Sequence, residues 1–222
     1  VNENILFCEM KPITYQIIEK LHKDLVVKSS DGKLILGDTG VKLQQKTHQL
    51  FSGTIKFEDG STRVIDTSKA EFIKEKFQGY KIGIFYKFIA ELEMLKSVFG
   101  ESLTTDLTEF DATNKNIALQ IVSGREGISL RNAAHLVFMN IDFSAVSYFQ
   151  AKDRMTTLER KENTIFWIFA KDGIEEKIYK TVQGKKDYTN STFKKDFNVR
   201  ATTSNKNNQQ ANKRWLALSK SN

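Results

Sequence analysis

The sequence has few of the residues that cross-link a chain or ligate metals. Cys8 is the only cysteine in 222 residues, which excludes an internal disulfide and predicts a reducing, cytosolic setting. One cysteine and three scattered histidines also argue against a structural zinc site. No apolar run approaches the roughly 20 residues of a membrane span, and no basic segment before an apolar core marks a signal peptide. We therefore expect no membrane partner.

The sequence also lacks the motifs by which many nucleotide hydrolases hold ATP and its metal. Two Gly-Lys pairs occur, at Gly32 and Gly184, but neither has the upstream glycine and the following Ser or Thr of a G-x-x-x-x-G-K-[ST] phosphate loop. No Asp-Glu pair is present to hold Mg²⁺. Because these groups cradle the β- and γ-phosphates and their metal, we expect no ATP hydrolysis by this chain alone.

The positive charge is concentrated at the carboxyl end. The net charge is +7, and residues 185–222 carry all of it, so residues 1–184 are neutral overall. A neutral body with a basic tail predicts an electrostatic contact with an acidic partner; a solubilising tail is the alternative. Within the tail, residues 201–213 are polar and of low complexity, and we expect them to be flexible.

The first 66 residues predict a helical and β-hairpin attachment. Apolar residues recur at helical spacing over residues 11–28, and residues 41–52 fit a second helix. An Asp-Gly pair lies between two short strand-like runs, residues 54–57 and 63–66, which is a hairpin signal.

Strands alternate with helix-length segments between residues 67 and 184. Short apolar strands separated by helices predict a parallel α/β sheet with both faces covered. Ser68 is expected to cap the first of these helices, and Gly100 to end the second. The strand candidates are residues 81–86 (KIGIFY), 117–122, 135–139 (HLVFM) and 164–170 (TIFWIFA), and further helices are expected over residues 88–99, from Ser144 through Arg154, and over residues 173–182.

Three segments in this region resemble motifs IV, V and VI of superfamily 2 helicases and translocases. They are residues 81–91 (KIGIFYKFIAE), 123–130 (SGREGISL) and 144–160 (SAVSYFQAKDRMTTLER). The Swi/Snf-like group is the most similar, in the compact versions carried by bacteriophages. In that group an N-x-D turn follows motif V, here residues 140–143 (NIDF), and a Q-x-x-x-R helix follows the turn. The resemblance covers about residues 40–185, including the helix at residues 41–52.

The resemblance implies a fold and a function. The fold would be α/β, with a RecA-like parallel sheet and flanking helices over residues 67–184, preceded by the attachment at residues 1–66 and followed by the basic tail at residues 185–222. The function would be that of the C-terminal motor half of a DNA-dependent ATPase. ATP and Mg²⁺ would be held mainly by an N-terminal RecA-like lobe, in the same or another chain, and a DNA or RNA backbone would lie across both lobes. The setting would be the cytoplasm of a bacterial or phage-infected cell.

The resemblance also implies two catalytic arginines on the third segment. Gln150 and Arg154 are four residues apart and share one face of a helix, where an arginine can stabilise the charge that develops in phosphoryl transfer. The second arginine of the family motif is expected three residues after the first, where Thr157 stands instead. Arg160 is the nearest substitute. Arg154 and Arg160 are therefore the catalytic candidates.

The remaining site residues follow from the same three segments. Gly127 and Gln150 are the candidate nucleotide-binding residues; a glycine lets the backbone approach a ligand closely. A purely structural role is open for each residue, and a strand-end aromatic such as Tyr86 often only closes the core. The candidates for nucleic-acid binding are Ser123, Arg125, Tyr86 and Lys87.

Two other functions remain open from the sequence. One is a stand-alone nucleic-acid or protein binding module without ATPase activity, which Thr157 favours slightly. The other is a type III restriction-like or different superfamily 2 subunit. A phosphate loop and an Asp-Glu box upstream in the same reading frame would favour the motor.

Overall fold

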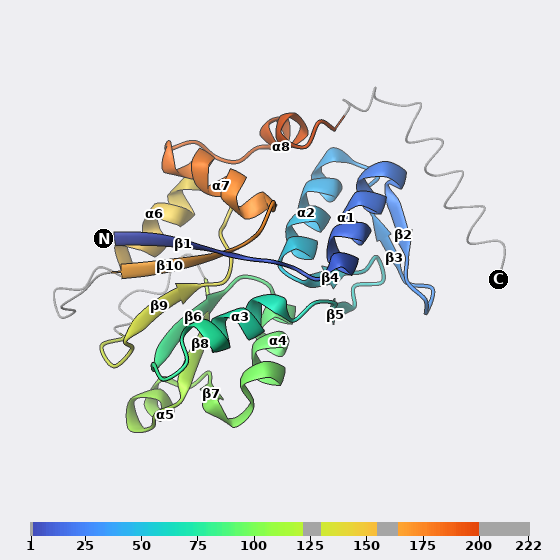
Figure 1. Cartoon of the computed structure of the whole chain (residues 1–222). Helices are drawn as coiled ribbons and strands as arrows, with labels where there is room; N and C mark the ends of the chain where they lie inside the picture. Colours follow the sequence, from blue (N-terminus) through green and yellow to red (C-terminus); the bar gives the residue numbers. More distant parts are fainter. Residues whose placement is uncertain (1, 122–129, 155–163, 200–222) are drawn as a thin grey trace.

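A parallel β-sheet forms the centre of the molecule. The computed structural model describes residues 2–121, 130–154 and 164–199. Within these residues the sheet has six strands in the order β1-β10-β9-β6-β8-β7, and every pairing is parallel (Figure 1). The strands are β1 (Asn2–Cys8), β6 (Ile82–Tyr86), β7 (Leu103–Thr104), β8 (Asn116–Gln120), β9 (His135–Phe138) and β10 (Thr164–Ala170).

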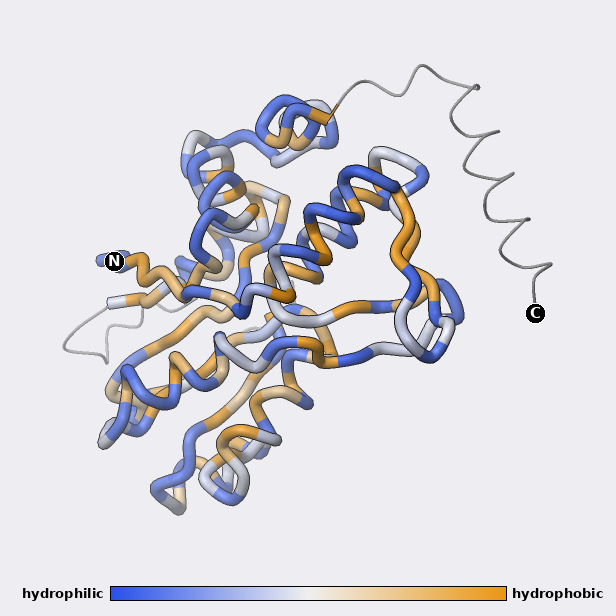
Figure 2. Tube along the Cα trace, turned by 45° about the vertical axis from the view of Figure 1, so that its right-hand side comes forward, coloured by the Kyte–Doolittle hydropathy of each residue, from blue (hydrophilic) through white to orange (hydrophobic). Residues whose placement is uncertain are grey.

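Helices cover the sheet on two sides. In Figure 1, α6 and α7 lie above the β1–β10–β9 part of the sheet, and α3 and α4 lie below it. Figure 2 shows hydrophobic residues along the strands and on the inward sides of the helices. The helices of this part are α3 (Ser68–Lys76), α4 (Ile89–Phe99), the short turn η1 (Gly100–Ser102), α5 (Leu107–Ala112), α6 (Ala145–Arg154) and α7 (Ile174–Gln183). The predicted α/β, RecA-like class is confirmed.

Most of the predicted strands and helices of this region are present. The apolar runs form β6, β8, β9 and β10, and all five residues of β6 are buried because both faces of the sheet are covered. Helix α4 ends at Gly100, whose φ of 56° suits a residue without a side chain. Helix α3 begins at Ser68 itself, with Thr67 in the capping position, one residue earlier than expected.

The sheet has two strands that the sequence analysis did not place in it. Strand β1 lies in the segment expected to form the attachment, yet it pairs with β10 along its whole length, from Asn2 opposite Thr164 to Cys8 opposite Ala170. It begins with three polar residues and ends with four apolar ones, and only Cys8 in it is buried, which is typical of a half-covered edge. Strand β7 is only two residues long. The polar start of β1 and the shortness of β7 leave both strands without the buried apolar pattern of the central strands.

The attachment is a pair of helices and two small hairpins. Helix α1 (Pro12–Asp24) is shorter than expected because Leu25 adopts a φ of 62°, and β-branched residues then begin β2 (Val26–Lys28), which pairs with β3 (Leu34–Leu36). Helix α2 (Gly40–Phe51) confirms the second predicted helix. The predicted hairpin is also confirmed, as β4 (Thr54–Lys56) and β5 (Thr62–Val64).

Asp66 connects the attachment to the sheet region. Its carboxylate accepts hydrogen bonds from the Lys11 amide at 2.8 Å and the Thr14 hydroxyl at 2.7 Å at the start of α1. It also accepts the Ser68 amide at 2.9 Å at the start of α3. One side chain therefore fixes the first turns of two helices.

The predicted basic tail begins with a packed helix, α8 (Asn190–Asp196). Its Phe193 is fully buried, and the Asn190 side-chain amide donates to the Gly40 carbonyl at the start of α2, 2.6 Å away. Residues 201–213, expected to be flexible, lie outside the described residues. In the described ranges, no helix combines the length and apolarity that crossing a bilayer requires.

Candidate functional site at the carboxyl edge of the sheet

The ends of β6 and β9 meet at one edge of the sheet. Strand β6 ends at Tyr86 and continues into Lys87, while β9 continues through Asn140 to Asp142. The Lys87 ammonium forms an ion pair with the Asp142 carboxylate at 3.0 Å, and both side chains are partly exposed. Open parallel sheets bind ligands at this edge, so these residues occupy the expected location of a site.

Glu91, in the first turn of α4, holds the two strand ends together. Its Oε1 accepts the Phe88 amide at 2.8 Å and the side-chain amide of Asn140 at 3.0 Å. The side chain is fully buried, and burial raises the pKa of Glu91, although the positive charge of Lys69 opposes this shift. Its Oε2 has no hydrogen-bond partner among the described residues. The carboxylate therefore orders the backbone that carries Lys87.

His48 connects the attachment to the same strand ends. Its Nε2 lies 2.6 Å from the Asn140 Oδ1, which also accepts the Ile141 amide at 2.8 Å. Burial lowers the pKa of His48 to about 3, so the ring is neutral at pH 7 and donates from Nε2 to the amide oxygen. The ring packs between Phe88 and Phe143, with centroid distances of 5.1 and 4.7 Å. Helix α2 is thus joined directly to the candidate site.

A buried ion pair lies in the interior next to the end of β9. Lys69 on α3 and Glu175 on α7 are both fully buried and contact each other, and the Lys69 ammonium also donates to the Met139 carbonyl at 3.1 Å. Burial raises the pKa of Glu175, and the Lys69 charge opposes that shift. Two helices and the end of β9 are therefore held by one lysine.

A second carboxylate anchors α6, the helix that carries Gln150 and Arg154. Glu3 on β1 accepts a hydrogen bond from the Tyr148 hydroxyl at 2.6 Å and from the Tyr179 hydroxyl at 3.1 Å. Tyr148 is buried, whereas Gln150, two residues later, lies on the opposite, exposed face. The inner face of α6 is therefore fixed on β1, and Gln150 is exposed on its outer face.

The structure describes four of the eight predicted site residues. Tyr86 is 7% exposed, so its ring closes the core, and Lys87 beside it is partly exposed and paired with Asp142. Gln150 is exposed on α6, and Arg154 is the last residue of that helix. The predictions for Ser123, Arg125, Gly127 and Arg160 fall outside the described residues.

Sequence reasoning missed the roles of His48, Asn140, Glu91 and Glu3. Glu91 had a local signal, since it lies three residues after the helix-capping position, and Asn140 was noted only as the start of the N-x-D turn. In the described part of the chain, no group of three or more His, Cys, Asp or Glu side chains is arranged to hold a metal ion.

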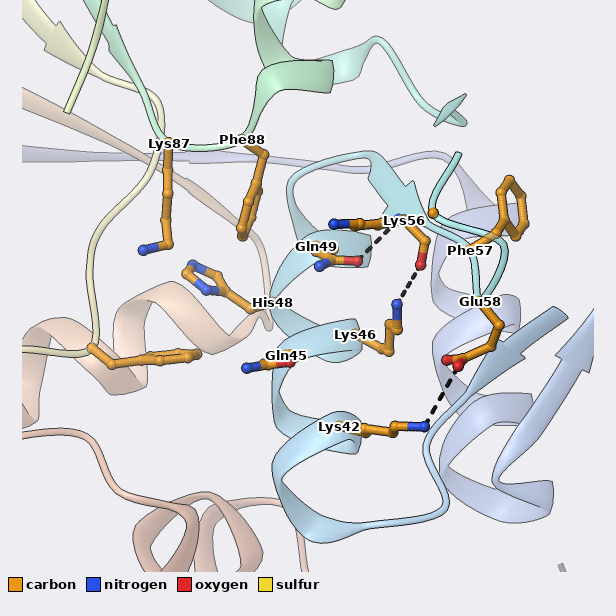
Figure 3. Close-up of a pocket in the computed structure, with 12 residues that line it drawn as sticks. Lys42, Gln45, Lys46, His48, Gln49, Lys56, Phe57, Glu58, Lys87 and Phe88 are labelled. Atoms are coloured by element: carbon orange, nitrogen blue, oxygen red, sulfur yellow. Dashed lines mark hydrogen bonds and ion pairs between the residues drawn. The ribbon is translucent and has the colours of Figure 1, made fainter. Parts of the chain in front are cut away.

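A basic pocket of about 550 Å³ opens beside this edge. Lys42 and Lys46 reach it from α2, Lys56 from β4, and Lys87 and Phe88 from the end of β6 (Figure 3). The pocket therefore lies between the attachment and the candidate site.

Comparison with known proteins gives a similarity of fold. No protein-family model matches the sequence, and no curated protein matches it. The structure is similar to the Sulfolobus solfataricus SWI2/SNF2 ATPase core in complex with dsDNA, with a TM-score of 0.58 and 17% identity over 99% of this chain and 49% of that chain. It is also similar to the C-terminal part of the Fun30 ATPase domain, with a TM-score of 0.55 and 16% identity over 97% of this chain and 98% of that chain.

These two similarities define the class of the fold. The chain spans about half the length of the Sulfolobus core and nearly all of the Fun30 C-terminal part. It has the fold of the C-terminal, RecA-like lobe of a SWI2/SNF2 ATPase.

Proposed function

We propose that this chain is the C-terminal motor half of a DNA-dependent ATPase of superfamily 2. The observation that carries the proposal is the match to the C-terminal part of the Fun30 ATPase domain over nearly the full length of both chains. The similarity to an ATPase core solved with dsDNA supports a nucleic-acid backbone as the partner. The bacteriophage-type assignment rests on the sequence resemblance alone and is part of the proposal.

ATP and Mg²⁺ would be held by a first RecA-like lobe. This chain has no phosphate loop and no Asp-Glu box, and its described residues offer no metal-ligand cluster. A bound metal would neutralise charge on the phosphates. The contribution of this chain would be Gln150 and Gly127 toward the nucleotide, and Arg154 and Arg160 toward the charge that develops during phosphoryl transfer.

The nucleic-acid backbone would contact the ends of β6 and β8. Lys87 is partly exposed there, and its side chain is oriented by the Asp142 carboxylate. A phosphate that approached Lys87 would share the ammonium with Asp142. We expect the aromatic ring of Tyr86 to support the strand end from within the core, with Ser123 and Arg125 as the other proposed contacts.

A binding module without ATPase activity is the second candidate, and Thr157 at the position of the usual second arginine is the observation that favours it. The experiment that separates the two functions uses a longer protein in which this lobe follows a first lobe with a phosphate loop. We expect phosphate release that DNA stimulates, and none from the present chain alone. DNA-stimulated release by the pure chain, or its absence from the longer protein, contradicts the proposal.

A further inference from the structure

The basic pocket holds two lysines that form no ion pair among the described residues. Lys42 forms ion pairs with Asp38 at 3.4 Å and Glu58 at 3.5 Å, so its charge is largely compensated. In the described part of the chain, no carboxylate lies within ion-pairing distance of Lys46 or Lys56. Glu58 is the one carboxylate among the described lining residues, and it is paired with Lys42, so Lys46 and Lys56 leave the pocket with an excess of positive charge.

Lys46 is the more informative of the two lysines because it is only 8% exposed. Its ammonium donates a hydrogen bond to the Lys56 carbonyl (Figure 3). Burial lowers the pKa of Lys46, which reports the cost of removing an ammonium from water. A single carbonyl satisfies one of its three N–H groups, so an anion in the pocket would stabilise the charged form.

The other walls suit a nucleotide strand. His48 is neutral and adds no charge, while Phe88 and Phe143 present aromatic surface beside the lysines. Lysines bind phosphate as point charges, whereas carboxylates are bound most specifically by arginine forks, and no arginine is among the described lining residues. The pocket is also continuous with Lys87 at the end of β6.

We propose that this pocket binds backbone phosphates of a nucleic-acid strand through Lys46 and Lys56. The site extends the nucleic-acid interface from the carboxyl edge of the sheet onto the attachment. The inference rests on the proposed function, because that function places the backbone beside Lys87.

The test measures binding of fluorescein-labelled double-stranded DNA by anisotropy at 50 and 200 mM KCl, using the full chain. The variant is Lys46→Gln/Lys56→Gln. The matched control is Lys20→Gln/Lys23→Gln, which removes the same charge from the exposed face of α1. Loss of two phosphate contacts lowers the slope of log K against log salt by about 1.8 and raises Kd at 50 mM by roughly 10- to 100-fold. We expect the control to stay within about 2-fold.

Each other outcome has a distinct meaning. If the parent binds DNA and the Kd and salt slope of the Lys46→Gln/Lys56→Gln variant change no more than those of the Lys20→Gln/Lys23→Gln control, the pocket site is wrong and the proposed function stands. If the parent binds no DNA at either salt concentration, the proposed function and the pocket site both fail. If Lys46→Gln unfolds the chain, as circular dichroism would show, Lys56→Gln alone decides, because its side chain is exposed; we expect its slope to fall by about 0.9.

Competitors identify the source of the anion. Polyglutamate of matched charge represents an acidic protein, and tripolyphosphate represents a free phosphate compound. We expect neither to compete with DNA for the pocket as strongly as an unlabelled duplex does. If polyglutamate or tripolyphosphate competes as strongly as the unlabelled duplex, and this competition is lost in the Lys46→Gln/Lys56→Gln variant, the assignment of the pocket to nucleic acid is overturned.

Discussion

Removing the Lys69 ammonium should destabilise the fold more than most single substitutions. Lys69 and Glu175 are both fully buried, so Lys69→Met leaves an uncompensated carboxylate in the interior and the Met139 carbonyl without its donor. Breaking a buried pair from one side costs roughly 3–5 kcal/mol. That is a large part of the about 5–15 kcal/mol by which a domain is stable. The urea midpoint at pH 7, with an unchanged m-value, measures the loss.

Two further variants test the cause of that loss. Lys69→Met/Glu175→Leu removes both charges, and we expect it to recover to within about 1 kcal/mol of the parent. Lys76→Met, on the exposed face of the same helix, should change stability by less than about 0.5 kcal/mol. A single Lys69→Met variant that loses less than about 1 kcal/mol, or a double variant no more stable than the single one, refutes the reasoning.

The pH dependence of the Lys69→Met variant has a definite sign. Burial already raises the pKa of Glu175, and loss of the lysine charge raises it further. A carboxyl group whose pKa is higher in the folded than in the unfolded state binds more protons in the folded state. Its ionisation therefore destabilises the fold as the pH rises from the unfolded pKa through the folded pKa. Lowering the pH from 7.5 toward 5 should therefore recover part of the deficit.

Two other predictions concern the contacts that hold the candidate site. Burial lowers the pKa of His48 to about 3, against 6.5 for the unperturbed group, so the stability of the fold is full above pH 6.5 and declines as the pH falls toward 3. The urea midpoint measured between pH 6.5 and 3 should depend less on pH in the His48→Asn variant than in the parent. An unchanged pH dependence of the midpoint contradicts the argument. Glu3→Gln keeps an acceptor but loses the charge-assisted bonds of Tyr148 and Tyr179, so we expect a loss of about 1–3 kcal/mol. In an intact motor the Glu3→Gln variant should lower ATP turnover while its DNA affinity, measured by anisotropy, stays within about 2-fold of the parent. Equal losses of ATP turnover and DNA affinity would show a general folding defect instead.

The parts of the fold that the sequence predicted share a local signal. Strands β6, β9 and β10 are continuous apolar runs, and α4 ends at a glycine. Strand β1 escaped prediction because its apolar run is only four residues long and nothing in it specifies its partner. That partner is 162 residues away, in the pairing of Asn2 with Thr164. Helix α8 is seven residues long, too short for its periodicity to be recognised.

The candidate site was harder to predict because its contacts are non-local. His48 bonds Asn140 across 92 positions of the chain, and Asn140 bonds Glu91 across 49. No spacing rule connects such residues; only the fold brings them together. The sequence predicted Lys87 through its motif, but not that the attachment reaches the same strand end through His48 and supplies the lysines of the basic pocket.

This geometry bears on how the attachment and the lobe act together. The His48 ring is neutral and enclosed, and its hydrogen bond to Asn140 shares one network with the Glu91 carboxylate that orders the Lys87 backbone. A phosphate bound in the pocket would contact the same helix, α2. If the pocket binds a phosphate as proposed, the contact on α2 would be linked through His48 and Asn140 to the ends of β6 and β9.

The two candidate arginines can be separated in an intact motor that contains this lobe. Arg154 keeps the four-residue spacing from Gln150, and the helix that carries it is fixed on β1. Arg160 lies outside the described residues; under the proposed function it would replace a second arginine, whose expected position is occupied by Thr157. We expect Arg154→Ala to abolish turnover, with KM raised as well. Steady-state phosphate release over a range of ATP concentrations gives kcat and KM.

Arg160→Ala gives the sharper result because it tests a single role. A contact made only in the transition state lowers kcat and leaves KM nearly unchanged. As the substitute for the second catalytic arginine, Arg160 should contribute on the order of 10³-fold to kcat, the low end for arginines that stabilise the charge of phosphoryl transfer. DNA affinity should survive both substitutions, which excludes misfolding as the cause. A kcat within a few-fold of the parent means that Arg160 does not replace the second catalytic arginine. The charge must then come from Arg154 alone or from a nearby cation such as Lys152.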